Sequence, residues 1–149
     1  MNGRHTLAAC IPIAMFLAPP TSAKTRPVRV SLVALLANPE KYDGKLVGVY
    51  GYLHKKFEDS ALYLSKMDGD FLIGKNALWV NYGKKVGWQP NSKTEIKSVK
   101  YFDCRHVLVV GQFDTQSRGH LGSYSGALKN VERVMELIRH YDGRKPLKP

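Results

Sequence analysis

Residues 46–54 alternate strictly between two kinds of side chain, and this alternation constrains the fold more than any other feature of the sequence. One set of alternating positions is aliphatic or glycine: Val47, Val49, Gly51 and Leu53. The other set is Gly48, Tyr50, Tyr52 and His54. Successive side chains of a β-strand point to opposite faces of the sheet. The segment therefore predicts a strand with an aliphatic inner face and an aromatic outer face.

Three further segments share this period of two. Residues 61–65 follow a polar turn at 55–59 and predict the second strand of a hairpin, and residues 77–82 predict a third strand. Residues 105–113 are apolar on both faces, which predicts cover on both sides. The inward-facing side chains expected from the first three strands are Val47, Val49, Leu53, Leu62, Leu64, Leu78 and Val80.

Helical signals are limited to the two ends of this region. Ser31 is a good N-cap for a short helix with leucines on one face, and Asn38 followed by Pro39 is expected to stop it. Residues 128–138 fit either an additional helix near the C-terminus or a further strand. The pattern predicts a mainly β fold, a small antiparallel barrel with a short N-terminal helix.

Two of the predicted strands resemble those of the OB-fold. Both contain a Val-x-Val-x-Gly pattern, in residues 47–53 and 107–113, and the glycine lets a strand bend around a barrel. The segment that leads into the first strand is similar to the opening of small exported bacterial OB-like proteins of unassigned function. The resemblance covers residues 31–134. It implies an OB-like architecture and no particular activity.

The N-terminal 23 residues have the zones of a secretory signal. Arg4 gives a positive start, residues 6–18 are almost wholly apolar, and small residues precede an expected cleavage between Ala23 and Lys24. Cys10 sits in a stretch with the residue types of a lipoprotein site, but its apolar segment follows the cysteine. We expect an exported protein, periplasmic or extracellular, with no transmembrane segment in the mature chain.

The mature chain is expected to consist of three parts. Residues 24–30 predict an extended leader, residues 31–138 one OB-like β domain, and residues 139–149 a basic tail. Removing the signal lowers the formal charge from +11 to +10, because Arg4 is the only Lys, Arg, Asp or Glu in it. A positive field favours anionic partners, although it also serves solubility alone.

No catalytic or metal-binding signature is present in the sequence. His54, His106, His120 and His140 lack the spacing of a metal site, and no cofactor motif occurs. Cys104 is predicted to be a shielded thiol beside a buried strand. An enzyme remains the alternative, with a site near His120 and an acid such as Asp114 or Glu132.

The candidate ligand-binding surface is the aromatic outer face of the first three strands. The strand register places Tyr50, Tyr52, His54, Tyr63, Trp79 and Asn81 on this face. Lys55 and Lys56 lie at its margins, as do Lys84 and Lys85, and His120 is a further candidate from a loop. His54 is expected at the boundary with water. Rings for stacking and lysines for charge suit single-stranded nucleic acid, an acidic saccharide or an envelope surface. The alternative is that the rings are cross-strand pairs that stiffen the sheet, or are covered by the N-terminal helix.

The sequence thus favours an exported, non-enzymatic basic binding module. Its ligand would be an anionic polymer or a protein partner in the cell envelope. Solvent exposure of Tyr52 and Trp79 would support this hypothesis, whereas a cleft joining His120 to an acid would support the enzyme.

Processing should remove residues 1–23 during export. The expected result is an intact mass of secreted protein that begins at Lys24, because the charged, apolar and small-residue zones direct a signal peptidase to Ala23. A mass that keeps the apolar segment, or that carries a diacylglycerol on Cys10, would contradict this prediction.

Overall fold

A computed structural model describes residues 25–89 and 98–137 of the chain. The predicted signal segment 1–23, its cleavage site at Ala23 and Lys24, His140 and the tail 139–149 lie outside the described residues. The elements in chain order are β1 (Val28–Ser31), α1 (Leu32–Ala37), α2 (Pro39–Tyr42), β2 (Leu46–Lys56), β3 (Asp59–Tyr63), α3 (Lys66–Asp70), η1 (Gly74–Asn76), β4 (Ala77–Gln89), η2 (Val99–Phe102), β5 (Arg105–Asp114), η3 (His120–Gly122) and β6 (Ala127–Glu136).

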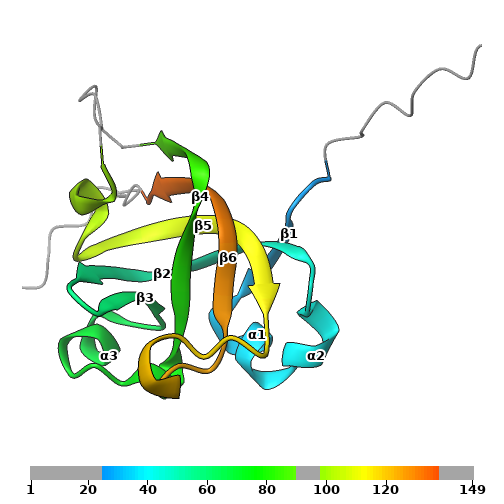
Figure 1. The fold of residues 1–149 in the computed structure, drawn as a ribbon, viewed down its shortest axis with the longest axis horizontal. Helices are drawn as coiled ribbons and strands as arrows, with labels where there is room; N and C mark the ends of the chain where they lie inside the picture. Colours follow the sequence, from blue (N-terminus) through cyan, green and yellow to red (C-terminus); the bar gives the residue numbers. More distant parts are fainter. Residues whose placement is uncertain (1–24, 90–97, 138–149) are drawn as a thin grey trace, which may run out of the picture.

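The strands form a six-stranded mixed sheet whose hydrogen bonding nearly closes into a ring (Figure 1). β2 pairs with β3, β3 with β4, β4 with β6, and β6 with β5, which pairs back with β2. β1 adds to the outside of this ring along β2. The mainly β prediction is confirmed. The expectation of antiparallel pairing is wrong at two places, because β1 with β2 and β4 with β6 are parallel.

The core fills the inside of the near-ring with the side chains that the alternation assigned to it. Val47, Val49, Leu53, Leu62 and Leu78 are fully buried there. Leu64 is an exception, since β3 ends at Tyr63 and the leucine beyond it is 39% exposed. The two faces of each strand are therefore assigned correctly over most of the sheet.

Short helical segments cover the openings of the near-ring. Ser31 caps α1 by accepting a hydrogen bond from the Ala34 backbone, as predicted, and Leu32 and Leu35 enter the core. Phe102 enters the same core from η2, which lies at the other end of the sheet in Figure 1. Pro39 ends α1 but also begins α2, because proline suits the first turn of a helix.

β6 resolves the ambiguity of the C-terminal segment in favour of a strand. Val131 and Val134 are buried, and their spacing of three, continued by Met135 and Ile138 in the sequence, suggested a helix. The spacing arises from a bulge at Asn130, whose φ is 48°, where the pairing with β5 shifts register. The additional C-terminal helix considered from sequence is thus wrong for residues 127–136, because a bulged strand can reproduce a helical period.

β1 overlaps the end of residues 24–30, which were predicted to be an extended leader. Val28, Arg29 and Val30 are extended as expected, but they pair in register with residues 47–49 of β2. Farther along, β4 continues through residues 83–89 of the polar segment for which no period was evident. The described part of the chain contains no helix long and apolar enough to span a bilayer.

Gly51 is the point in β2 where the sheet allows no side chain. A Cβ atom built there would lie 2.7 Å from both Leu62 Cγ and the Tyr63 carbonyl oxygen. Gly51→Ala should therefore destabilise the fold by about 1–3 kcal/mol, the usual cost of overpacking. Urea unfolding followed by circular dichroism measures this.

Gly48→Ala is the matched control in the same strand. The nearest atom to a Cβ at Gly48 would be Leu108 Cδ1 at 3.5 Å, an ordinary contact. We expect a stability within about 0.5 kcal/mol of the unaltered protein, because no neighbouring atom has to move to admit the methyl group. Equal effects of the two substitutions would show that Gly51 is not needed for close approach.

Candidate functional site

The predicted aromatic face exists, but it is covered. Tyr52, His54 and Tyr63 point away from the main core, as their register predicted, yet their exposed fractions are only 4%, 1% and 1%. The cover comes from α3 and from the loop 115–126, not from α1. The predictions of an open ring platform and of His54 at the water boundary are therefore wrong, because distant segments fold back over these apolar rings.

A second core of aromatic side chains fills the space under this cover. The buried members are Tyr52, Ala61, Tyr63, Ala77 and Tyr124, with Trp79 packed against them. Gly69 in α3 sits directly over Tyr52, since a Cβ there would be 3.0 Å from Tyr52 Cδ1. Burial raises the pKa of Tyr52 to about 12, with a further contribution from its hydrogen bond to Cys104. Tyr52 is a packed structural ring with no free face for a ligand.

Asp59 is the polar centre of the second core. Its Oδ1 accepts hydrogen bonds of 2.9 Å from the hydroxyls of Tyr63 and Tyr124, and its Oδ2 lies 3.0 Å from His54 Nδ1. The carboxylate is 8% exposed, so these partners replace the water it has lost. Burial, and then the bond to Asp59, raise the pKa of Tyr124 to about 12 and that of Tyr63 further. Both phenols stay neutral and act as donors.

This network ties distant parts of the chain together and has no access for a substrate. His54 comes from β2, Asp59 and Tyr63 from β3, and Tyr124 from the loop before β6. Sequence reasoning missed Asp59 and Tyr124, since Asp59 is a turn residue by local pattern and Tyr124 is 65 positions away along the chain. The arrangement of His, Asp and Tyr here is a clamp for the loop 115–126.

The remaining predicted residues lie at the margins of this cover. Trp79 is half-buried, donates from Nε1 to Asn81 Oδ1 at 2.8 Å, and is approached by Gly119, whose Cβ would be 2.7 Å from the indole. Lys55 and Lys56 lie at the end of β2. His120 Nε2 is 3.8 Å from Glu58 Oε2 on the surface. These residues do not form one site.

Two surface pockets among the described residues contain the acids named for the enzyme alternative, but neither joins them to His120. A surface pocket of about 310 Å³ is lined by Asp43, Gly44, Gln112 and Asp114, together with Phe113, Gln116 and Lys129, and His120 is not among its lining residues. Lys129 pairs with Asp114 and lowers the pKa of that carboxyl. A second pocket of about 330 Å³ includes Glu132, again without His120. Among the described residues, no group of three or more His, Cys, Asp or Glu side chains could hold a metal ion.

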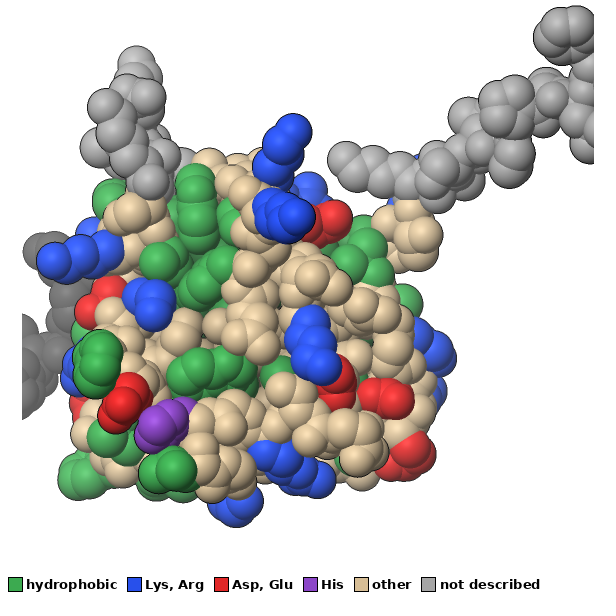
Figure 2. Space-filling view, viewed as in Figure 1, with side chains coloured by type: hydrophobic (Ala, Val, Ile, Leu, Met, Phe, Trp, Pro, Cys, Tyr) green, Lys and Arg blue, Asp and Glu red, His purple; other side chains and the backbone are tan. Residues whose placement is uncertain are grey.

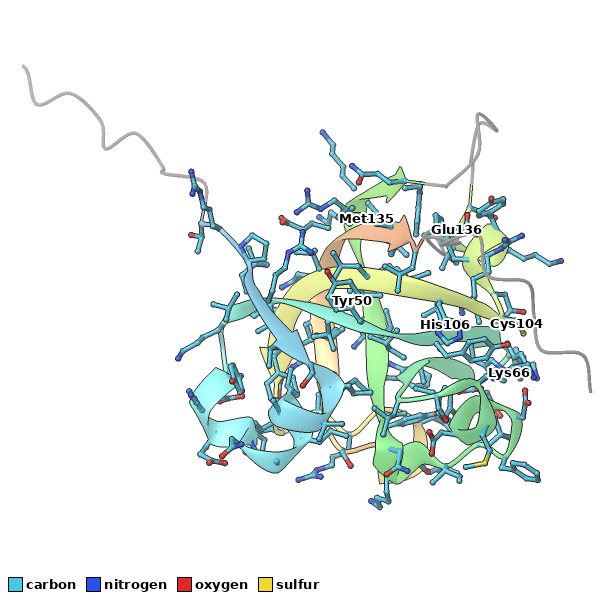
Figure 3. The ribbon with its side chains drawn as sticks, turned by 180° about the vertical axis from the view of Figure 1, so that it is seen from behind. Tyr50, Lys66, Cys104, His106, Met135 and Glu136 are labelled. Atoms are coloured by element: carbon cyan, nitrogen blue, oxygen red, sulfur yellow. The ribbon has the colours of Figure 1, made fainter. Side chains whose placement is uncertain are left out.

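Cys104 is exposed, contrary to the sequence prediction. It precedes β5 in a left-handed turn with φ of 56°, and its backbone N–H donates to Leu53 O at 2.8 Å. This turn aims the side chain at the outer surface beside Asp103, at 3.7 Å from Oδ1, where Figure 3 shows it near the edge of the molecule. Proximity to a buried strand did not imply burial, because the chain reverses at this residue.

Tyr50, on the outer side of β2, is the tyrosine of the predicted surface that stays exposed, at 39% (Figure 3). Arg29 is paired in register with Gly48, Gly48 with Val110, and Val110 with Arg133. The two arginines thus stand at the ends of one row across the sheet, with glycine and valine between them. We call this row and Tyr50 the arginine face.

The arginine face carries two guanidinium groups, and one of their hydrogen-bond donors has no acceptor within the described chain. Arg29 donates to the Tyr50 hydroxyl, and its guanidinium carbon lies 5.9 Å from the centre of that ring. Arg133 Nε is buried and has no hydrogen-bond partner within the described chain. Neither arginine forms an ion pair with a carboxylate of residues 25–89 or 98–137. A buried donor without a partner is uncommon, and the described chain supplies no acceptor for Arg133 Nε.

Comparison with known proteins found no matching family model, no matching curated protein and no matching solved structure.

Asp59→Ala should destabilise the protein by about 3 kcal/mol or more, because it leaves two buried hydroxyls and one imidazole without their acceptor. Tyr124→Phe removes a single hydrogen bond and should cost about 1 kcal/mol. Thermal and urea unfolding measure both changes. Equal, small effects from the two variants would contradict a clamp centred on Asp59.

Proposed function

We propose that the protein is an exported, non-enzymatic basic module of OB-fold type that binds an acidic polysaccharide across its arginine face. The observation that carries this proposal is the placement of Arg29 and Arg133 at the two ends of one row, with no carboxylate partner for either among the described residues. Guanidinium groups form strong, charge-assisted hydrogen bonds with carboxylates and sulfates.

The strand connections support the OB-type part of the proposal. β2, β3 and β4 are consecutive antiparallel neighbours, and β5 returns by a longer connection to lie beside β2. This order is that of a Greek key, and β6 completes the near-ring between β4 and β5. An OB-fold is a five-stranded, partly open Greek-key barrel. β1 is an addition on its outside.

The spacing of the two arginines favours a polymer over a single small ion. Three inter-strand steps of about 4.8 Å place their Cα atoms about 14 Å apart along the row. A chain with repeated negative charges can contact both, whereas one carboxylate cannot. Between the two arginines, Gly48 and Val110 are both buried, so the row has a closely packed, uncharged floor.

The burial of the other rings favours a saccharide over single-stranded nucleic acid. Binding of single strands relies on several exposed rings on which successive bases stack. Tyr52 and Tyr63 are buried in the second core, so Tyr50 is the one ring of the predicted platform on the arginine face. A single ring beside two cations suits a sugar with a neighbouring acid group.

The double substitution Arg29→Gln with Arg133→Gln tests the proposal. We expect at least a tenfold loss of affinity for an acidic polysaccharide such as heparin, because each charge-assisted hydrogen bond contributes about 1.5–3 kcal/mol. The salt dependence of binding should flatten as well. Isothermal titration at two salt concentrations measures both quantities, with single-stranded DNA as a parallel ligand.

Lys56→Gln with Lys75→Gln is the matched control, since it removes the same charge from two exposed lysines at the end of β2 and in η1, away from the arginine face. This control should lower affinity by about twofold or less, as expected for surface charges outside a binding site. If the two double variants weaken binding equally, only a diffuse positive field is involved. Stronger binding of DNA than of the polysaccharide would overturn the choice of ligand.

A further inference from the structure

Three turns at one end of the molecule carry large hydrophobic side chains that project into solvent. Phe57 in the β2–β3 turn is 93% exposed, and Leu121 in η3 is 87% exposed. Phe71 and Leu72, after α3, are 75% and 58% exposed. We call these four side chains the apolar tip. Figure 2 shows hydrophobic side chains gathered at the end of the molecule that holds α3 and the loop after β5.

Contacts between the three turns make the apolar tip one surface. His120 Nε2 lies 3.8 Å from Glu58 Oε2, which joins η3 to the β2–β3 turn. Ser125 Oγ donates to Lys75 O at 2.7 Å, and Gly74 packs closely on the Ser123 carbonyl. These contacts join the segment after α3 to the loop 115–126. These contacts hold the three turns of the apolar tip against the loop 115–126.

Two members of the apolar tip occupy backbone conformations that do not favour leucine. Leu72 has φ of 53° and Leu121 has φ of 52°. Glycine and asparagine adopt this left-handed region with little conformational strain, whereas other residues do so at a free-energy cost. Both side chains are mostly exposed, so burial in the core does not offset this cost. Leucine at these two positions is explained by a contact outside the chain.

The surroundings of the apolar tip are positively charged. Lys56, Lys75 and Arg118 are exposed and form no ion pair with another described residue. Of the exposed acids of the region, Asp70 pairs with Lys66, which leaves Glu58 as one acid against these three cations. Uncompensated cations therefore border the hydrophobic side chains.

We propose that the apolar tip inserts into the interface of an anionic lipid bilayer. Separate side chains that protrude from convex turns can each enter the boundary between headgroups and acyl chains, while neighbouring cations contact anionic headgroups. A stable protein interface instead needs about 800 Å² of complementary surface on each partner. This surface is separate from the arginine face and does not depend on the polysaccharide proposal.

Flotation with lipid vesicles tests the insertion. The secreted protein, its N-terminus defined by intact mass, is mixed with vesicles of equal parts phosphatidylglycerol and phosphatidylcholine, or of phosphatidylcholine alone. Unaltered protein should float with the anionic vesicles. Leu72→Asn with Leu121→Asn should weaken partitioning by at least about tenfold, because two leucines lose their transfer from water. Asparagine tolerates a positive φ, so the fold should be kept.

Val33→Asn is the control, since Val33 on α1 is 58% exposed, the same fraction as Leu72. It should leave partitioning within about twofold of the unaltered protein, as expected for a residue outside the apolar tip. No flotation of unaltered protein, or equal flotation of all three proteins, would overturn the proposal. Arg29→Gln with Arg133→Gln should float normally even where it no longer binds polysaccharide, so failures of the two proposals are distinguishable.

Discussion

Strand β2 forms backbone hydrogen bonds with three other strands, and this pairing sets the positions of nearly every other element. Its first eight residues pair with β5, its last five with β3, and residues 47–50 also pair with β1. Tyr52 and Leu53 have partners on both sides. The strand must bend to pass from one neighbour to the other. Gly51 permits the bend, because the Tyr63 carbonyl occupies the space that a side chain would need.

Closing the sheet in this way creates two interiors with different chemistry. The inside of the near-ring is almost wholly apolar, with the buried Tyr82 hydroxyl as an exception, whereas the outer face of β2, β3 and β4 holds rings with several polar groups. An isolated outer face of this kind would expose several aromatic side chains to water. α3 and the loop 115–126 bury them, and Asp59 satisfies the hydroxyls and the imidazole that go with them. The second core therefore depends on residues that are far apart along the chain.

The placement of the two interiors decides which surfaces remain for binding. The outer face of β2, β3 and β4 is used for packing, so it offers no stacking platform. Farther along the outer side of the same sheet lie Tyr50 and two arginines that have no carboxylate partner within the described residues. The cover itself carries exposed hydrophobic side chains on its turns. The arginine face and the apolar tip are thus two separate surfaces, and neither includes the buried rings of the second core.

The sequence by itself determined the strands and their two faces. Side chains of a strand alternate by simple geometry, so Val47, Val49 and Leu53 could be assigned to the inside and Tyr52 to the outside without a structure. Capping chemistry is equally local, and Ser31 was identified as the N-cap for that reason. The OB-like pattern of valine and glycine anticipated a mainly β fold, although it did not predict the parallel pairings.

Only the tertiary structure decided whether an outward-facing residue meets water. Tyr52 and Tyr50 have the same parity in one strand, yet the first is 4% and the second 39% exposed, because α3 reaches only one of them. The bulge at Asn130 gave a strand the spacing of a helix, and a left-handed turn brought Cys104 to the surface. Exposure depends on segments that are distant in sequence, and a local period carries no information about where such segments fold back.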